Sequence, residues 1–234
     1  MPGTIEIIHR ALVLSDEIWT AWHRPDTCIA ACRVLQRALR EIGIRPLPVV
    51  ARVECYNAVL VEAMNSGHWE SMTDAERLVW RDEVNAWGVG LGFDDPAYAL
   101  GIKRRPPNHS GIHVCLIEPI EQILIDPTLG QASRPAKNLI LPQSIVAPAT
   151  NDFIAGKVTM RIGFNDGVEA RYTLFPGEAG RWLVSPDWIE SKRSKSLSKQ
   201  IIRGLKTNGI TTRRTSERGR SGEHRAIGHI KINA

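Results

Sequence analysis

The residue that points most directly to chemistry is Cys28. It follows Asp26 and Thr27, which are good N-cap residues, so we expect it in the first turn of a helix that keeps a helical apolar spacing up to Gly43. The unpaired N–H groups and the dipole at a helix start favour an anion, and they therefore stabilise the thiolate, the nucleophilic form of cysteine. The other role of a lone cysteine is that of a small buried hydrophobic residue, and that role is open here.

A histidine and an aspartate could complete a relay with this cysteine. His113 and Asp126 stand 13 positions apart, at the outer ends of a predicted hairpin that turns at Pro119-Ile120. Those two ends lie side by side in an antiparallel pair. An aspartate there can accept a hydrogen bond from the imidazole, fix its tautomer and stabilise its protonated form, while the other ring nitrogen faces the Cys28 thiol. Alternatively, His113 is an ordinary strand residue and Asp126 starts a turn before Pro127.

The elements that would position these residues are helices in the first half of the chain and strands in the second. This order predicts an α+β fold with N-terminal helices packed on an antiparallel sheet. The expected helices run from Ile7 to about Trp22 with an interruption at 15–17, from about Cys28 to Gly43, and from a capping box at Thr73 and Glu76 to Gly88. The expected strands are Leu47–Tyr56, His113–Glu118, Gln122–Asp126, Lys157–Phe164, Val168–Leu174 and Trp182–Ser185.

Length and composition place the chain among ordinary globular proteins. It has 234 residues, of which 43% are hydrophobic and 24% charged. No apolar run reaches the ~18 residues that a transmembrane helix needs, and the first residues lack the pattern of a secretory signal. Four cysteines are too few for a disulfide scaffold at this length. We therefore expect a cytoplasmic, reduced protein without membrane contact.

The positive charge is concentrated at the C-terminus. Residues 191–234 hold 12 Lys or Arg and two acidic residues, a net +10, whereas residues 1–190 hold 18 basic and 23 acidic residues, a net −5. The segment 191–234 has no aromatic residue, so we expect a basic, mostly disordered tail with a short helix near Leu197–Leu205, appended to a domain at 1–190. Such a tail is either an electrostatic arm for nucleic acid or another polyanion, or a solvated segment without a specific partner.

The order of a cysteine at a helix start, a histidine on a strand and an aspartate on the next strand resembles the papain-like fold in its transglutaminase-like branch. The stretch from Cys28 to Ile44 resembles the nucleophile helix of that family, with the exit Ile42-Gly43-Ile44 placing Gly43 15 positions after the cysteine. Residues 111–117 resemble its histidine strand and residues 122–128 its aspartate strand. The similarity covers roughly residues 20–135, about half of the chain.

The resemblance implies a transglutaminase-like core in which Cys28 is the nucleophile, His113 the general base and acid, and Asp126 the residue that orients His113. In this family an acyl group passes to the cysteine and then to water or an amine. The backbone N–H of Cys28 would help to hold the oxyanion, with a second donor from Trp22 or His23. The implied function is a hydrolase or acyltransferase that acts on an amide or peptide substrate without a metal or an organic cofactor.

The sequence departs from the family pattern next to the motifs. Thr27 precedes the cysteine and Ile112 precedes the histidine, where many members have a glycine-tryptophan pair and an aromatic residue. Gly43 and His113 are 70 positions apart, and the stretch between them includes a tryptophan-rich helix. It could hold a lid or a substrate-selecting element, but core packing is the expected role of its Trp80 and Trp87.

Two other functions compete with the enzyme. The first is a zinc-binding structural site, since Cys28 and Cys32 are one helical turn apart and His113 and Cys115 share a strand face. Neither pair has the tight Cys-x-x-Cys spacing of a structural zinc site. The second is an inactive binding module that holds nucleic acid with its basic tail. The remaining cysteine and histidines form no recognisable set: Cys55, His9, His68, His109, His224 and His229.

Overall fold

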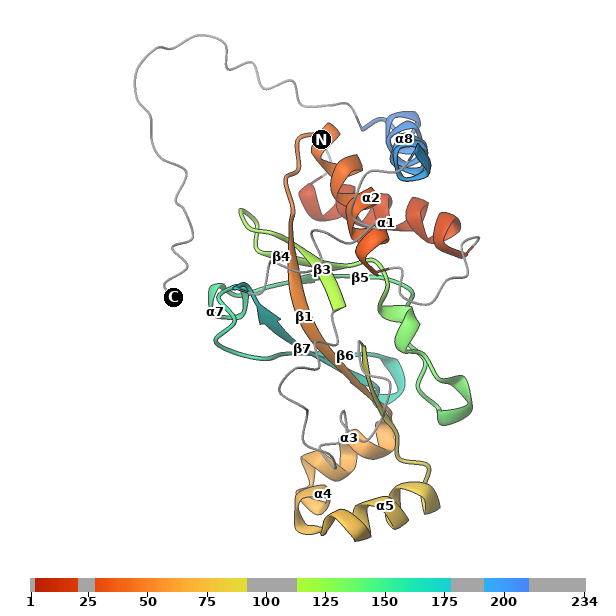
Figure 1. The fold of residues 1–234 in the computed structure, drawn as a ribbon, viewed down its shortest axis with the longest axis vertical. Coiled ribbons are helices and arrows are strands. Elements are labelled where there is room, and N and C mark those ends of the chain that lie inside the picture. The colour runs from red at the N-terminus through yellow and green to blue at the C-terminus, as the bar shows by residue number, and fades with distance from the viewer. Residues whose placement is uncertain (1–2, 21–27, 92–112, 178–191, 211–234) are drawn as a thin grey trace.

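The structure is a computed structural model that describes residues 3–20, 28–91, 113–177 and 192–210 (Figure 1). The expected strand at 182–185 lies outside these residues. Among the described helices, none has the length and apolar character to cross a membrane.

The architecture is α+β, as predicted, and its centre is a curled antiparallel sheet. In the described part of the chain the sheet has seven strands in the order β5-β4-β3-β1-β7-β6, and β2 also pairs with β1. Their bounds are β1 Leu47–Tyr56, β2 Gly88–Leu91, β3 His113–Glu118, β4 Ile123–Asp126, β5 Ile145–Pro148, β6 Met160–Gly163 and β7 Glu169–Phe175.

The long strand β1 organises this sheet. Its first half, Leu47–Ala51, pairs with β3, and its second half, Val53–Tyr56, pairs with β2. Along its other edge β1 pairs with β7 over Val50–Tyr56. β1 coincides with the strand expected from its β-branched and apolar residues, and Pro48 stands near its start, where it was expected.

Three helices lie on one side of the sheet: the first two contact its strands, and the third packs on those two helices (Figure 1). They are α1 Thr4–Thr20, α2 Cys28–Glu41 and α8 Lys192–Thr207. On β3, Val114 and Leu116 pack into the helix-side core, whereas Cys115 and Ile117 pack into the core on the opposite face. This alternation places Cys115 and Ile117 on the face away from the helices.

The second face of the sheet packs on loops and short helical segments. These include η1 Leu129–Ala132 and α7 Asn151–Ile154, whose Leu129, Ala132 and Phe153 belong to the core on this face. The short segments η2 Pro135–Lys137 and η3 Asn165–Gly167 bury no residue. A third, smaller core forms where β1 ends, around Tyr56 and Trp69, among the helices α3 Ala58–Asn65, α4 His68–Ser71 and α5 Asp74–Glu83.

The helix starts and stops follow the sequence signals in most places. The capping box of Thr73 and Glu76 begins α5, and Gly43, with φ +92°, follows the end of α2. Helix α5 is shorter than expected and buries no residue, although Trp80 packs against the third core. The interruption expected at 15–17 is wrong. Helix α1 continues through these residues, and the Ser15 hydroxyl donates to the carbonyl of Ala11 in the preceding turn (2.6 Å) instead of capping a new helix start.

The largest correction concerns the C-terminal segment. The expected short helix near 197–205 is a helix of 16 residues, α8, which packs against α1 and α2. Leu197, Ile201 and Leu205 are buried in the helix-side core, and the Ser198 hydroxyl donates to the carbonyl of Val34 on α2 (3.0 Å). The expectation of a mostly disordered tail is therefore wrong for residues 192–210, which belong to the folded body. Residues 211–234 lie outside the described part.

Candidate functional site

The register of two strands brings His113 and Asp126 together. On the β3–β4 pair, Leu116 lies opposite Ile125 and Ile117 opposite Leu124. Continuing this register places Asp126 opposite Cys115. His113 is two residues from Cys115 along β3, so His113 is the diagonal neighbour of Asp126 on the same face of the pair. Long side chains reach each other across such a diagonal.

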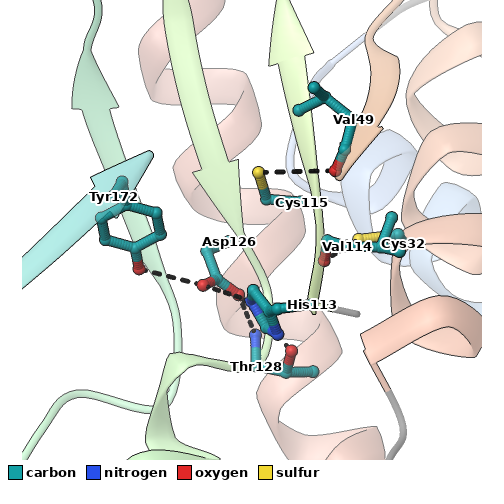
Figure 2. Close-up of polar contacts among 8 residues, drawn as sticks. All are labelled: Cys32, Val49, His113, Val114, Cys115, Asp126, Thr128 and Tyr172. Atoms are coloured by element: carbon teal, nitrogen blue, oxygen red, sulfur yellow. Dashed lines mark hydrogen bonds and ion pairs between the residues drawn. The ribbon is translucent and has the colours of Figure 1, made fainter. Parts of the chain in front are cut away.

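The two side chains form a buried hydrogen-bonded pair (Figure 2). His113 Nε2 lies 2.8 Å from Asp126 Oδ2, and the side chains are only 1% and 0% exposed. The second carboxylate oxygen, Oδ1, accepts the backbone N–H of Thr128 (2.9 Å) and lies 3.4 Å from the Thr128 hydroxyl. The carboxylate is therefore held from both sides and cannot rotate freely.

Tyr172 is a member of this network that the sequence did not reveal. It lies on β7, opposite Val53 of β1, and its hydroxyl donates to Asp126 Oδ2 at 2.9 Å (Figure 2). The inward direction of Tyr172 follows from the alternation of buried residues along β7. Its proximity to Asp126 depends on the curl of the sheet, because β7 and β4 are not paired strands.

Cys28 is the first residue of α2, as predicted, and lies beside His113. It is 6% exposed, and its side chain forms a hydrogen bond with His113. Since Nε2 of the ring faces Asp126, Nδ1 is the ring nitrogen available to Cys28. One turn further along α2, the Cys32 thiol donates to the carbonyl of Val114 at 3.1 Å, and this contact joins the helix to β3 next to His113 (Figure 2).

The charged forms of His113 and Asp126 stabilise each other. Burial by itself disfavours the imidazolium, but the Asp126 carboxylate, its hydrogen bond to the ring and the contact with Cys28 raise the pKa of His113 to about 10. Burial would likewise raise the pKa of Asp126. His113 and the hydrogen bonds from Thr128 and Tyr172 outweigh that effect and lower it. At neutral pH the pair is therefore an imidazolium and a carboxylate.

The other three cysteines have raised pKa values. Burial raises the pKa of each of the thiols of Cys32, Cys55 and Cys115, and nearby carboxylate or thiol groups raise it further. They are 0% exposed. These three residues are therefore protonated at neutral pH and closed to solvent.

The side chains of the alternative zinc site do not converge. Cys32 packs in the core on the helix side of the sheet and Cys115 in the core on the opposite face. The Cys115 thiol lies 3.9 Å from the carbonyl of Val49 (Figure 2). Within the described ranges, no group of three or more His, Cys, Asp or Glu side chains could hold a metal ion.

Trp22 and His23, the expected additional oxyanion donors, lie outside the described residues. The geometry thus joins three of the residues selected from the sequence, Cys28, His113 and Asp126, and adds Tyr172 and Thr128 around the aspartate.

Comparison with known proteins identifies no family. No protein-family model matches the chain, and neither a curated protein nor a solved structure is similar to it.

Proposed function

We propose that this protein is a thiol-dependent hydrolase or acyltransferase that acts on amide or peptide bonds. Cys28 is the nucleophile, His113 transfers the proton and Asp126 orients His113. The observation that carries the proposal is the position of His113, which is hydrogen-bonded to Asp126 through Nε2 and also to the side chain of Cys28. A nucleophile, a base and a group that orients the base are the three parts of such a relay.

A transglutaminase-like, papain-type core is part of this proposal. Its support is the arrangement of a cysteine at the start of α2, a histidine at the start of β3 and an aspartate at the end of β4, with α2 packed on β3. The backbone N–H groups in the first turn of α2 have no partner within the helix, so they can donate to an oxyanion that forms near Cys28.

The first step forms an acyl-enzyme. The Cys28 sulfur, as thiolate, attacks the substrate carbonyl carbon and forms a C–S bond. The tetrahedral intermediate then collapses, the C–N bond breaks, and the departing amine takes a proton from the His113 imidazolium. The products are a free amine and a thioester on Cys28, with His113 neutral.

The second step releases the acyl group. His113 takes a proton from water, or from an acceptor amine, as that molecule attacks the thioester carbonyl. The C–S bond breaks, and the thiolate of Cys28 and the imidazolium of His113 are restored. Atoms and charge balance over the cycle with only the chain, the substrate and the acceptor.

The relay works only with a reduced cysteine, and none of the four cysteines forms a disulfide. We therefore include a reducing, cytoplasmic compartment in the proposal.

An activated acyl donor tests the proposal without knowledge of the natural substrate. The full chain is mixed with p-nitrophenyl acetate, and release of p-nitrophenol is followed together with the mass of the protein. We expect a burst of about one p-nitrophenol per chain, an acetyl group on the peptide that contains Cys28, and faster turnover when hydroxylamine is added as an amine acceptor.

Variants separate the relay from unspecific thiol chemistry. Cys28→Ala should abolish the burst, and His113→Gln should slow it at least tenfold, whereas the control Cys55→Ala, on the opposite face of the sheet, should keep it. Acetylation spread over several residues, or a burst that survives Cys28→Ala, would contradict the proposal.

A further inference from the structure

Helix α8 has a buried face and an exposed face. Its buried residues are Ser194, Leu197, Ser198, Ile201 and Leu205, and this face packs on α1 and α2 (Figure 1). With 3.6 residues per turn, these five positions fall within an arc of about 100° around the helix axis.

The opposite face of α8 carries a line of cations, which we call the α8 basic stripe. It consists of Lys192, Lys195, Lys199, Arg203 and Lys206, all exposed. The same helical spacing places the five within an arc of about 80°, on the side away from the buried face. Residues 192–210 contain no acidic residue, so no carboxylate of this segment neutralises the stripe.

The stripe is straight and rigid because a packed helix carries it. From Lys192 to Lys206 the helix rises by about 21 Å, so successive cations are about 5 Å apart along the axis. Duplex DNA rises by about 3.4 Å per base pair and carries a phosphate on each strand at every step. A stripe of this length therefore spans the phosphates of about six base pairs.

We propose that the α8 basic stripe binds the phosphate backbone of a nucleic acid. This role is independent of the thiol chemistry proposed for Cys28. The exposed residues beside the stripe include Ser196 and Gln200, whose side chains are also common phosphate donors. Helix α8 has no aromatic residue that could stack on a base, so the binding is insensitive to base sequence.

Two other anionic partners fit this helix less well. An amphipathic helix binds a membrane surface through a free apolar face, and the apolar face of α8 is buried against α1 and α2. Protein interfaces have an apolar core and are depleted in lysine, whereas four of the five stripe residues are lysines. A regular row of charges matches a linear polyanion best.

The test compares two matched double variants of the full chain. Lys199→Gln with Arg203→Gln removes two cations four residues apart from the centre of the stripe. Lys157→Gln with Arg161→Gln removes the same two residue types, at the same separation and also exposed, from the region around β6. Both variants keep residues 211–234, so any binding by that segment is common to them.

Binding to a fluorescent duplex of about 20 base pairs, which exceeds the length of the stripe, is measured by anisotropy between about 50 and about 200 mM salt. We expect salt-dependent binding for the wild-type chain. The α8 variant should bind at least tenfold more weakly, and its plot of log K against log salt should be less steep by about 2, because each lost phosphate contact lowers the slope by about 1. The Lys157/Arg161 variant should bind as the wild type does.

Any of three other results would overturn the inference. They are the absence of binding to duplex and to single-stranded oligonucleotides, equal weakening by both double variants, and binding to anionic lipid vesicles without binding to nucleic acid. Alkylation of Cys28 should be unchanged in the α8 variant, which shows that the protein is folded and keeps the two proposals separate.

Discussion

The hydroxyl of Tyr172 and Nε2 of His113 bind the same oxygen of Asp126, at 2.9 and 2.8 Å. The two groups therefore share one acceptor, and the donor from Tyr172 withdraws charge from the oxygen that holds the imidazole. Together with Thr128 on the second oxygen, Tyr172 fixes the direction of the carboxylate inside the curled sheet. Tyr172 is a positioning residue of the relay, since it acts on His113 only through Asp126.

Tyr172→Phe should lower the free energy of unfolding by about 1.5–3 kcal/mol, the usual range for a hydrogen bond to a charged group. The pH at which His113 titrates should rise, because Asp126 becomes a stronger partner for the imidazolium. Urea unfolding and the NMR signals of the imidazole measure the two effects. The matched control is Tyr56→Phe, since Tyr56 donates at 3.2 Å to the partly exposed Glu54 and does not touch the relay. If the titration of His113 is the same in both variants, Tyr172 has only a structural role.

The pH dependence of stability should report the His113–Asp126 pair. Folding raises the pKa of His113 to about 10 from the usual value near 6.5, so the folded state binds the proton more tightly than the unfolded state. The stability from this shift is fully present below about pH 6.5 and is lost as the pH rises toward 10. Urea unfolding between about pH 7 and pH 9 should therefore show a falling free energy of unfolding.

Asp126→Asn provides the comparison for this pH dependence. The variant removes the charge that raises the pKa of His113, so its free energy of unfolding should fall less steeply over the same pH range. Asp126 also raises the pKa of the buried thiols and of Tyr172, so the two curves are compared below about pH 8, where thiols and tyrosines are mostly protonated in the folded and the unfolded protein and the difference reports His113. Identical slopes would mean that His113 is neutral in the folded protein.

Helix α8 should contribute to the stability of the whole body. Ile201 of α8 is fully buried in the helix-side core. Ile201→Ala should therefore lower the free energy of unfolding, measured in urea or by heating, by about 2–5 kcal/mol. Gln200→Ala, on the exposed side of the same helix, is the control and should change it by less than about 0.5 kcal/mol. A change at Ile201 as small as that at Gln200 would indicate that α8 is not docked.

The sequence predicted the parts of the site that depend on local patterns. The hairpin around Pro119 and Ile120 joins β3 to β4, so a two-residue alternation was enough to place His113 and Asp126 on one face. The N-cap signal placed Cys28 in the first turn of α2, and the packing of α2 on β3 brought it to the histidine.

Features that depend on distant parts of the chain could not be predicted in this way. Tyr172 reaches Asp126 because β7 pairs with β1 and the sheet curls, and no local pattern carries that information. Composition misled the interpretation of 192–210, where the basic residues concealed the helical spacing of Leu197, Ile201 and Leu205. These three apolar residues are sufficient to dock α8 on the body, because α1 and α2 already provide an apolar surface for them.

The most direct test of the relay is the rate at which iodoacetamide labels each cysteine of the native protein at neutral pH, measured by peptide mass mapping. Cys28 should react fastest because it is 6% exposed and lies beside His113, whereas Cys32, Cys55 and Cys115 are 0% exposed and have raised pKa values. His113→Gln should slow labelling of Cys28 at least tenfold while leaving the other three unchanged. Slow labelling of all four cysteines, or a Cys28 rate that does not depend on His113, would contradict the relay.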